Sequence, residues 1–261
     1  GSPFVSANVA AALIKAVGPM QTFFYMGAAF LAIMILCFIP FRFPRDGWTP
    51  AGWKPPAAAA ASAIDLNMGE MAKTSTFLGL FLCYVIGSLA GLMAIGISAS
   101  VAQEIIKIDP ATAATLVGVF AIFNGVGRPL FGVLTDKLSP KVAALISFVL
   151  ILVCSLGMLA AGPGSVMLYT LCFIGFWLVL GGWLAIAPTA TTIFFGVKNY
   201  AKNYGLVFFA YGLGAILGGI IAGQAKDTFG SFTFAFYPTA GLAVLGILIA
   251  MALMKPVKKA S

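Results

Sequence analysis

One charged side chain, that of Arg128, lies inside an otherwise uncharged apolar stretch that runs from Ala111 to Leu134. No other Lys, Arg, Asp or Glu occurs within the long apolar runs that follow Met20. A permanently charged guanidinium at membrane depth costs about 2.5 to more than 10 kcal/mol, depending on the method. A nearby anion would offset this cost, and no carboxylate in the apolar runs supplies one. We therefore expect the counter-charge of Arg128 to be a bound anionic solute.

The residues around Arg128 form a polar, deformable patch. Asn124 precedes Arg128 by four residues, so the two side chains share one face of a helix. Gly125 and Gly127 thin the helix, and Pro129 frees a backbone carbonyl about one turn earlier. A guanidinium presents donors in a fork that matches a carboxylate bidentately. The alternative is snorkelling, because the polar end of this stretch lies only about 12 Å away along a helix.

Two aromatic residues are further candidates for a solute site. Tyr211 lies in the apolar stretch 204–225 and offers a phenolic hydroxyl. Trp183 lies near the middle of the stretch 166–195, away from either membrane interface, so it could line a cavity. Packing in a protein core is the alternative role for both side chains.

The composition is that of a membrane protein. Hydrophobic residues make up 61% of the chain and charged residues 8%, whereas a soluble domain carries about 25% charged residues. The net charge of +8 then indicates membrane topology rather than nucleic-acid binding. The chain has no His, and its four Cys lie in apolar runs without a CxxC pair, which argues against a zinc site and a disulfide framework. With no carboxylate at membrane depth for acid–base chemistry, the sequence predicts no enzyme, no metal and no cofactor.

Seven stretches have the roughly 20 apolar residues that a membrane-spanning helix requires. They are residues 19–41, 74–101, 111–134, 142–161, 166–195, 204–225 and 232–254. The sequence therefore predicts an all-α, polytopic membrane protein. Residues 1–14 have the character of the end of an eighth helix, so we expect the chain to be a fragment of a longer protein.

The charged residues predict an orientation. The longest polar stretch, residues 42–73, is rich in Pro and Ala and is predicted to link two membrane units, residues 1–41 and 74–261. Eleven Lys and Arg lie on the side of this linker and the C-terminus and three on the other side; with Arg128 these are all 15. By the positive-inside rule, the linker and the C-terminus are cytoplasmic.

A second polar segment, residues 132–141, joins two predicted spans on the same side. It follows the pattern G-x-L-[ST]-D-[RK]-x-[GS]-x-[RK], with the marked positions at Gly132, Asp136, Lys137 and Lys141. We expect the glycine to permit close helix approach and the aspartate to cap or pair with a neighbouring helix end. The two lysines would hold the loop in the cytoplasm. An ordinary basic turn is the alternative.

With this loop, the segment 124–129 and the helix start 203–205 (Asn-Tyr-Gly), the chain resembles the oxalate/formate antiporter family of the major facilitator superfamily. That family includes bacterial monocarboxylate transporters. The resemblance implies the major facilitator fold, here from the end of helix five to the C-terminus, with a complete C-terminal six-helix half. It also implies that Arg128, in helix eight, binds a solute carboxylate and that Asn124 is a polar position on the solute side.

The chain departs from the family pattern at one position. Oxalate-exchanging members have a Lys in helix eleven, where the register of this chain places Tyr211. One intramembrane cation suits a monocarboxylate such as lactate, pyruvate, formate or acetate better than a dianion. The expected function is therefore secondary active transport of a small monocarboxylate by alternating access, as antiporter or symporter. The alternatives are an oxalate/formate-type exchanger and a transporter-derived receptor without flux.

The same reasoning predicts partners and location. The expected partners are the carboxylate, the lipid bilayer and the N-terminal half of the same protein, without nucleic acid. We expect a bacterial inner membrane. A carboxylate that couples transport to protons would lie in the rest of the protein or at a helix end, such as Glu104 or Asp109.

Overall fold

The computed structural model describes residues 2–42, 48 and 64–257. Two compact units divide the chain, Gly1–Pro55 and Pro56–Ser261. Most of the predicted linker, residues 42–73, falls outside the described residues, so its extent and the domain limits stay predictions.

The first unit contains two helices, α1 (Ser2–Val17) and α2 (Pro19–Phe38). Gly18 separates them with a φ of 83°, a backbone conformation that favours glycine. Pro19 then supplies a φ suited to the first turn of α2. The Thr22 hydroxyl donates a hydrogen bond of 2.8 Å to the Gly18 carbonyl and so fixes the junction.

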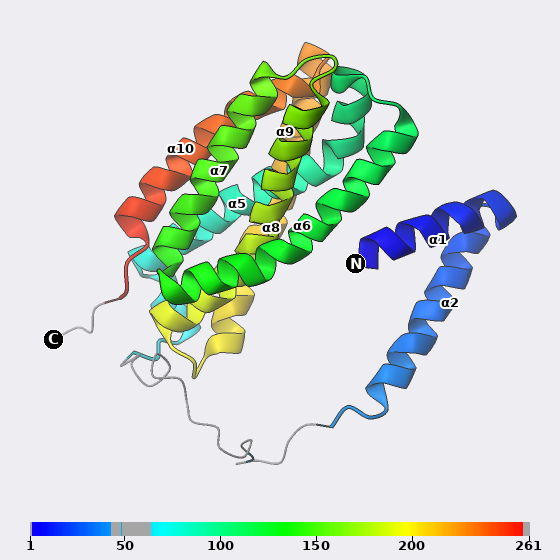
Figure 1. Ribbon diagram of the computed structural model, residues 1–261. Coiled ribbons are helices and arrows are strands. Elements are labelled where there is room, and N and C mark those ends of the chain that lie inside the picture. The colour runs from blue at the N-terminus through cyan, green and yellow to red at the C-terminus, as the bar shows by residue number, and fades with distance from the viewer. Residues whose placement is uncertain (1, 43–47, 49–63, 258–261) are drawn as a thin grey trace. The chain divides into compact units, whose positions relative to one another are not determined.

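The second unit is a bundle of six long helices that pack side by side (Figure 1). They are α5 (Ser75–Val101) with the π-helical turn η1 (Ala102–Ile106), α6 (Pro110–Lys137), α7 (Pro140–Ala160), α8 (Val166–Phe195), α9 (Tyr200–Phe229), and α10 (Phe236–Leu253) with the 3-10 helix η2 (Phe232–Ala235). Together with α2, seven helices in the described ranges are long and apolar enough to cross a membrane. They coincide with the seven predicted stretches, and no strand occurs in the described part of the chain, so the all-α prediction is confirmed.

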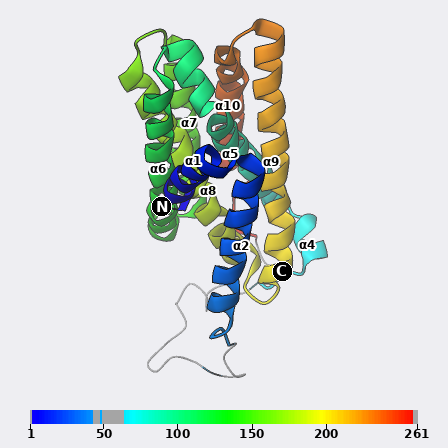
Figure 2. The ribbon, with the colours of Figure 1, turned by 90° about the vertical axis from the view of Figure 1, so that its right-hand side faces the viewer.

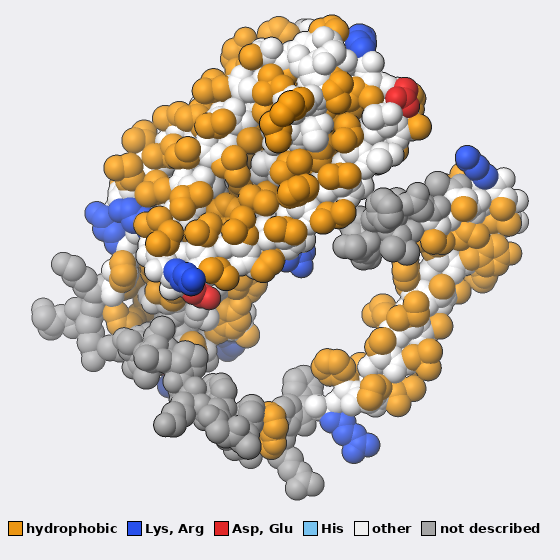
Figure 3. All heavy atoms as spheres, in the orientation of Figure 1, with side chains coloured by type: hydrophobic (Ala, Val, Ile, Leu, Met, Phe, Trp, Pro, Cys, Tyr) orange, Lys and Arg blue, Asp and Glu red, His pale blue; other side chains and the backbone are white. Residues whose placement is uncertain are grey.

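On the face of the α5–α10 bundle that Figure 3 shows, hydrophobic side chains cover the middle, while most of the visible charged side chains lie toward the two ends. Many large apolar side chains are accordingly exposed, as on α7, where Val149, Val153 and Leu156 are each more than half exposed. In water such a surface would be an aggregation liability, whereas lipid tails solvate it. The core instead holds aromatic side chains, among them Phe120, Phe173 and Trp183.

The packing of the bundle has internal symmetry. The most extensive helix pairs are α6 with α8, α5 with α9, and α7 with α10, followed by α7 with α8, α5 with α8 and α5 with α10. Exchanging α5, α6 and α7 with α8, α9 and α10 maps this set of pairs onto itself. Because three crossings of the bundle separate each helix from its equivalent, the two triplets run in opposite directions, as in an inverted repeat. Figure 2 shows the consequence: α6 and α9 lie at opposite sides, with α5 and α8 between them.

Small residues set the distances in the two symmetry-related pairs. A Cβ added at Gly127 of α6 would overlap the Leu178 carbonyl oxygen of α8, and one added at Gly181 would overlap the Asn124 carbonyl oxygen. In the equivalent α5–α9 pair, a Cβ added at Gly214 would overlap the Ser88 hydroxyl. These helices therefore touch backbone to backbone, which only glycine allows.

Residues 64–73, the C-terminal end of the predicted linker, pack against the α5–α10 bundle. They include the short helix α4 (Met68–Ala72), whose N-terminus is closed by a capping box between Asn67 and Glu70. The Leu66 carbonyl, just before this helix, accepts hydrogen bonds from the amides of Asn199 (3.2 Å) and Asn203 (3.0 Å). This end of the predicted linker is thus fastened to the start of α9, which assigns a structural role to the buried Asn203.

Candidate functional site

Arg128 and Tyr211 lie at the same depth of the bundle. Arg128 is nine residues from the end of α6 at Lys137, and Tyr211 is 11 residues from the start of α9 at Tyr200. At 1.5 Å per residue these positions are about 14 Å and 17 Å from the same end of the bundle. The two residues therefore lie at a similar depth, on the two helices that the inverted repeat relates, although they are not at equivalent positions of the repeat.

The guanidinium of Arg128 is exposed and, among the described residues, has neither a hydrogen-bond nor an ion-pair partner. The five residues on either side of Arg128 carry no charge, so the guanidinium has no anionic neighbour close by in the sequence. A cation in this place can bind an anion without first breaking an internal ion pair.

Asn124, one turn from Arg128, is half-buried and already has a partner. Its side-chain amide donates a 3.1 Å hydrogen bond to the Trp177 carbonyl of α8. The amide oxygen has no partner among the described residues' hydrogen bonds, so only the acceptor end of this side chain is free. Asn124 thus joins α6 to α8 directly above the arginine and fixes the turn that carries it.

Tyr211 is half-buried at the wall of a cleft of about 740 Å³. The cleft lies along α9 and is bordered by Phe81 of α5. Its lining is almost wholly apolar, with the Tyr211 phenol among its few polar groups. A small solute that enters it would therefore be oriented by hydrogen bonds to very few atoms.

Trp183 does not reach this surface. It is fully buried, its indole N–H donates a 3.1 Å hydrogen bond to the Ser147 hydroxyl, and its ring stacks on Tyr84 at a centroid distance of 5.7 Å. Gly87 on α5 provides the space for this ring, since a Cβ there would overlap it. In this conformation Trp183 packs in the core against Tyr84 and cannot touch a solute beside Arg128.

The loop motif, residues 132–141, differs from the prediction at two positions, Gly132 and Asp136. Gly132 has room for a Cβ, 4.0 Å from that of Ala185, so the close approach of α6 lies at Gly127 instead. Asp136 and Lys137 are exposed, and α7 is capped by Ser139, whose hydroxyl accepts from the Val142 N–H at 3.2 Å.

Lys141 makes the long-range contact of this loop. Its ammonium donates a 3.0 Å hydrogen bond to the Met251 carbonyl near the end of α10. A cation at a helix C-terminus also compensates the helix dipole. The motif loop is thereby tied to the last helix of the bundle.

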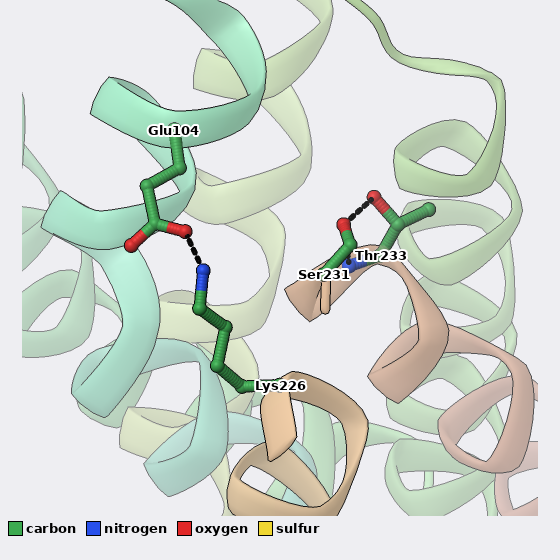
Figure 4. A network of polar contacts seen from close by, with 4 residues as sticks. All are labelled: Glu104, Lys226, Ser231 and Thr233. Carbon is green, nitrogen blue, oxygen red and sulfur yellow. Dashed lines mark hydrogen bonds and ion pairs between the residues drawn. The ribbon is translucent and has the colours of Figure 1, made fainter. Parts of the chain in front are cut away.

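Two carboxylates at the opposite end of the bundle, those of Glu104 and Asp109, already have partners. Glu104, in η1, forms an ion pair with Lys226 of α9 (Figure 4). The Lys226 ammonium also lies 5.2 Å from the Phe232 ring centroid. Asp109 caps α6 by accepting hydrogen bonds from the N–H groups of Ala111 and Thr112, and the bonds from Thr112 lower the pKa of its carboxyl. Asp109 is therefore ionised at neutral pH and is a helix cap.

Sequence reasoning did not single out Tyr84, which lies in the stretch 74–101 and has the local signature of an ordinary core aromatic. Only its packing against α8 and α9 reveals that its hydroxyl is fully buried without a partner in the described part of the chain. Within the same residues, no group of three or more His, Cys, Asp or Glu is placed to hold a metal ion.

Comparison with known proteins identifies the class. The family model described as Major Facilitator Superfamily matches residues 1–197 and residues 80–261, and each match covers more than half of the chain. The chain therefore belongs to the Major Facilitator Superfamily, and it is an integral membrane protein. The superfamily consists of transporters and not of enzymes, which confirms the prediction that the chain is not an enzyme.

Three known transporters are similar in sequence to this chain, but the similarity does not identify the solute of this chain. The oxalate:formate antiporter of Oxalobacter formigenes is 27% identical over 95% of this chain and 58% of its own length. The uncharacterized MFS-type transporter YhjX of Escherichia coli (strain K12) is 29% identical over 58% of this chain and 38% of its own length. Monocarboxylate transporter 9 of Mus musculus is 28% identical over 70% of this chain and 36% of its own length. The chain thus spans little more than half, or less, of these relatives.

Proposed function

We propose that this chain is the solute-binding part of a secondary transporter for a small carboxylate anion, in which Arg128 is the primary anion contact. The observation that carries the proposal is the guanidinium without a partner among the described residues, at a depth similar to that of Tyr211 on the two helices related by the inverted repeat. An isolated cation in a low-dielectric site gains most from a ligand that brings the opposite charge. Alternating access would follow from rocking of the α5–α10 bundle against a second bundle, with residues 1–41 in that second half and residues 42–73 between the two.

The proposed solute is a monocarboxylate such as lactate, pyruvate, formate or acetate. One guanidinium neutralises one carboxylate, and the helix equivalent to α6 supplies a neutral phenol rather than a second cation. Tyr211 then donates a hydrogen bond to the solute. Two of the relatives are named for the transport of small carboxylates, which supports this class and leaves oxalate/formate-type exchange as the alternative.

Binding measurements on the purified full-length protein test the solute class. We expect at least one of the four monocarboxylates to bind more tightly than oxalate or inorganic phosphate in calorimetric titrations. In Tyr211→Lys, the affinity for oxalate relative to that monocarboxylate should rise about tenfold, because a second cation then faces the second carboxylate. Tyr211→Phe is the matched control, and it should weaken binding without changing that ratio.

Each contrary outcome has a definite meaning. A folded Tyr211→Lys protein with unchanged selectivity would remove Tyr211 from the site. Tighter binding of oxalate by the wild-type protein would favour the exchanger. Binding without flux in proteoliposomes would favour a receptor.

We also propose, from the Lys and Arg distribution, that the predicted linker, residues 42–73, and the C-terminus, Lys255 to Ser261, face the cytoplasm of a bacterial inner membrane. Two exposed positions at opposite ends of the bundle report on this: Met68, in α4, and Pro163, between α7 and α8. In a variant without native cysteines, Pro163→Cys should react with an impermeant maleimide in intact cells, and Met68→Cys only after the membrane is opened. The reverse pattern would contradict the orientation.

A further inference from the structure

An aromatic ladder runs along α9 from its first residue to the depth of Arg128. Tyr200 and Tyr204 stack with ring centroids 5.5 Å apart, Tyr204 contacts Phe208 at 5.7 Å, and Phe208 stacks on Tyr211 at 5.3 Å. These residues are three or four positions apart and so share one helix face. All three tyrosines are partly exposed, and the two innermost rings border the cleft. The ladder therefore connects the depth of the arginine with the end of the bundle where α9 begins.

Tyr84 of α5 adds a buried hydroxyl to this ladder. Its ring lies between Trp183, on which it stacks, and Phe208 and Tyr211, whose centroids are 6.3 Å and 6.1 Å away. The side chain is fully buried, and within the described residues its hydroxyl oxygen has no hydrogen-bond partner. The rings of Tyr84 and Tyr204 both pack against Phe208, at centroid distances of 6.3 Å and 5.7 Å, so the two phenols lie on either side of one ring of the ladder.

A buried hydroxyl without a partner destabilises a fold, whereas Phe would fill the same space without this penalty. The hydroxyl therefore calls for a function that core packing does not supply. Tyr84 and Tyr204 together present two neighbouring phenol donors, and a carboxylate has two oxygens that accept hydrogen bonds. Lys198 and Lys202, both exposed at this end of α9, add positive charge at the entrance.

We propose that the hydroxyls of Tyr84 and Tyr204 form a second, weaker contact site for the carboxylate, between Arg128 and the end of the bundle at which α9 begins. This inference rests on the proposed function. A carboxylate held by a guanidinium at membrane depth leaves slowly unless weaker sites bind it on the way out. A pair of neutral phenols can bind the anion briefly by donating hydrogen bonds to it. In this step the Tyr204 side chain rotates and exposes the Tyr84 hydroxyl.

Two conservative substitutions in the full-length protein test the second site. Tyr84→Phe and Tyr204→Phe each remove one hydroxyl and keep the ring. With the tightest-binding of the four monocarboxylates as probe, each should lower the exchange rate in proteoliposomes about tenfold, the effect of one hydrogen bond to a charged group. The double variant should be little slower than the single ones, because both hydroxyls act on one anion. The equilibrium Kd should stay within about twofold of wild type.

Tyr200→Phe is the matched control, since it removes a hydroxyl from the same ladder one turn from Tyr204, and it should exchange at the wild-type rate. Tyr84→Phe should melt no lower than wild type, because its hydroxyl has no partner to lose. Wild-type exchange in both test variants, a lower melting temperature for Tyr84→Phe, or a loss of affinity parallel to the loss of rate would each overturn the second site. If the wild-type protein showed no Arg128-dependent carboxylate binding, the proposed function would fall, and this inference with it.

Discussion

Replacing Arg128 with Lys should weaken carboxylate binding by about ten- to a hundredfold although the positive charge is kept. Lys loses the planar fork that donates two hydrogen bonds to one carboxylate, and one bond to a charged group contributes about 1.5–3 kcal/mol. Arg128→Gln should be worse, because the anion then has no counter-charge. Titration of the purified full-length variants with the preferred monocarboxylate measures both effects.

The same pair of variants decides between solute binding and snorkelling. A Lys side chain snorkels as well as an Arg side chain, so a purely interfacial Arg128 would tolerate Lys with near-normal affinity. Insertion and expression should survive both changes, since removing an intramembrane charge eases burial. Wild-type affinity in Arg128→Lys would therefore refute the anchoring role.

The membrane-spanning helices could be predicted from the sequence because each depends only on the residues of its own apolar stretch. A run of about 20 apolar residues is long enough to cross a bilayer whatever it packs against, and all seven predicted stretches are helices. The depth of Arg128 followed in the same way, from its distance to the polar end of its stretch. The equivalence of α6 and α9 could not be predicted from the sequence, because the repeat is visible only in the contacts between helices.

Side chains whose role depends on a neighbouring helix were harder to predict. Trp183 and Tyr84 lie in apolar stretches and look alike in sequence, yet the Trp183 N–H is bonded to Ser147 and the Tyr84 hydroxyl has no partner among the described residues. Gly132 and Gly127 are likewise indistinguishable by type. Only the position of α8 shows that Gly127 is the point of close approach.

The glycine pair in α6 gives the second large expected effect: Gly127→Ala should destabilise the protein and weaken carboxylate binding at least tenfold, whereas Gly125→Ala should do neither. A Cβ at Gly127 overlaps the backbone carbonyl of Leu178, so α6 and α8 must separate, whereas a Cβ at Gly125 meets nothing within 4 Å. Overpacking of this kind costs about 1–3 kcal/mol.

The loss of affinity follows from the position of Gly127 next to Arg128. Separating the helices at this turn stretches the 3.1 Å hydrogen bond from Asn124 to the Trp177 carbonyl and displaces the turn of α6 that carries Arg128. Melting temperature and Kd, measured side by side for the two variants, check the prediction. Because the two glycines are two positions apart on one helix and differ only in what faces them, equal effects of both substitutions would show that helix propensity, and not the contact with α8, limits this site. Wild-type behaviour of Gly127→Ala would show that α8 can yield without disturbing the arginine.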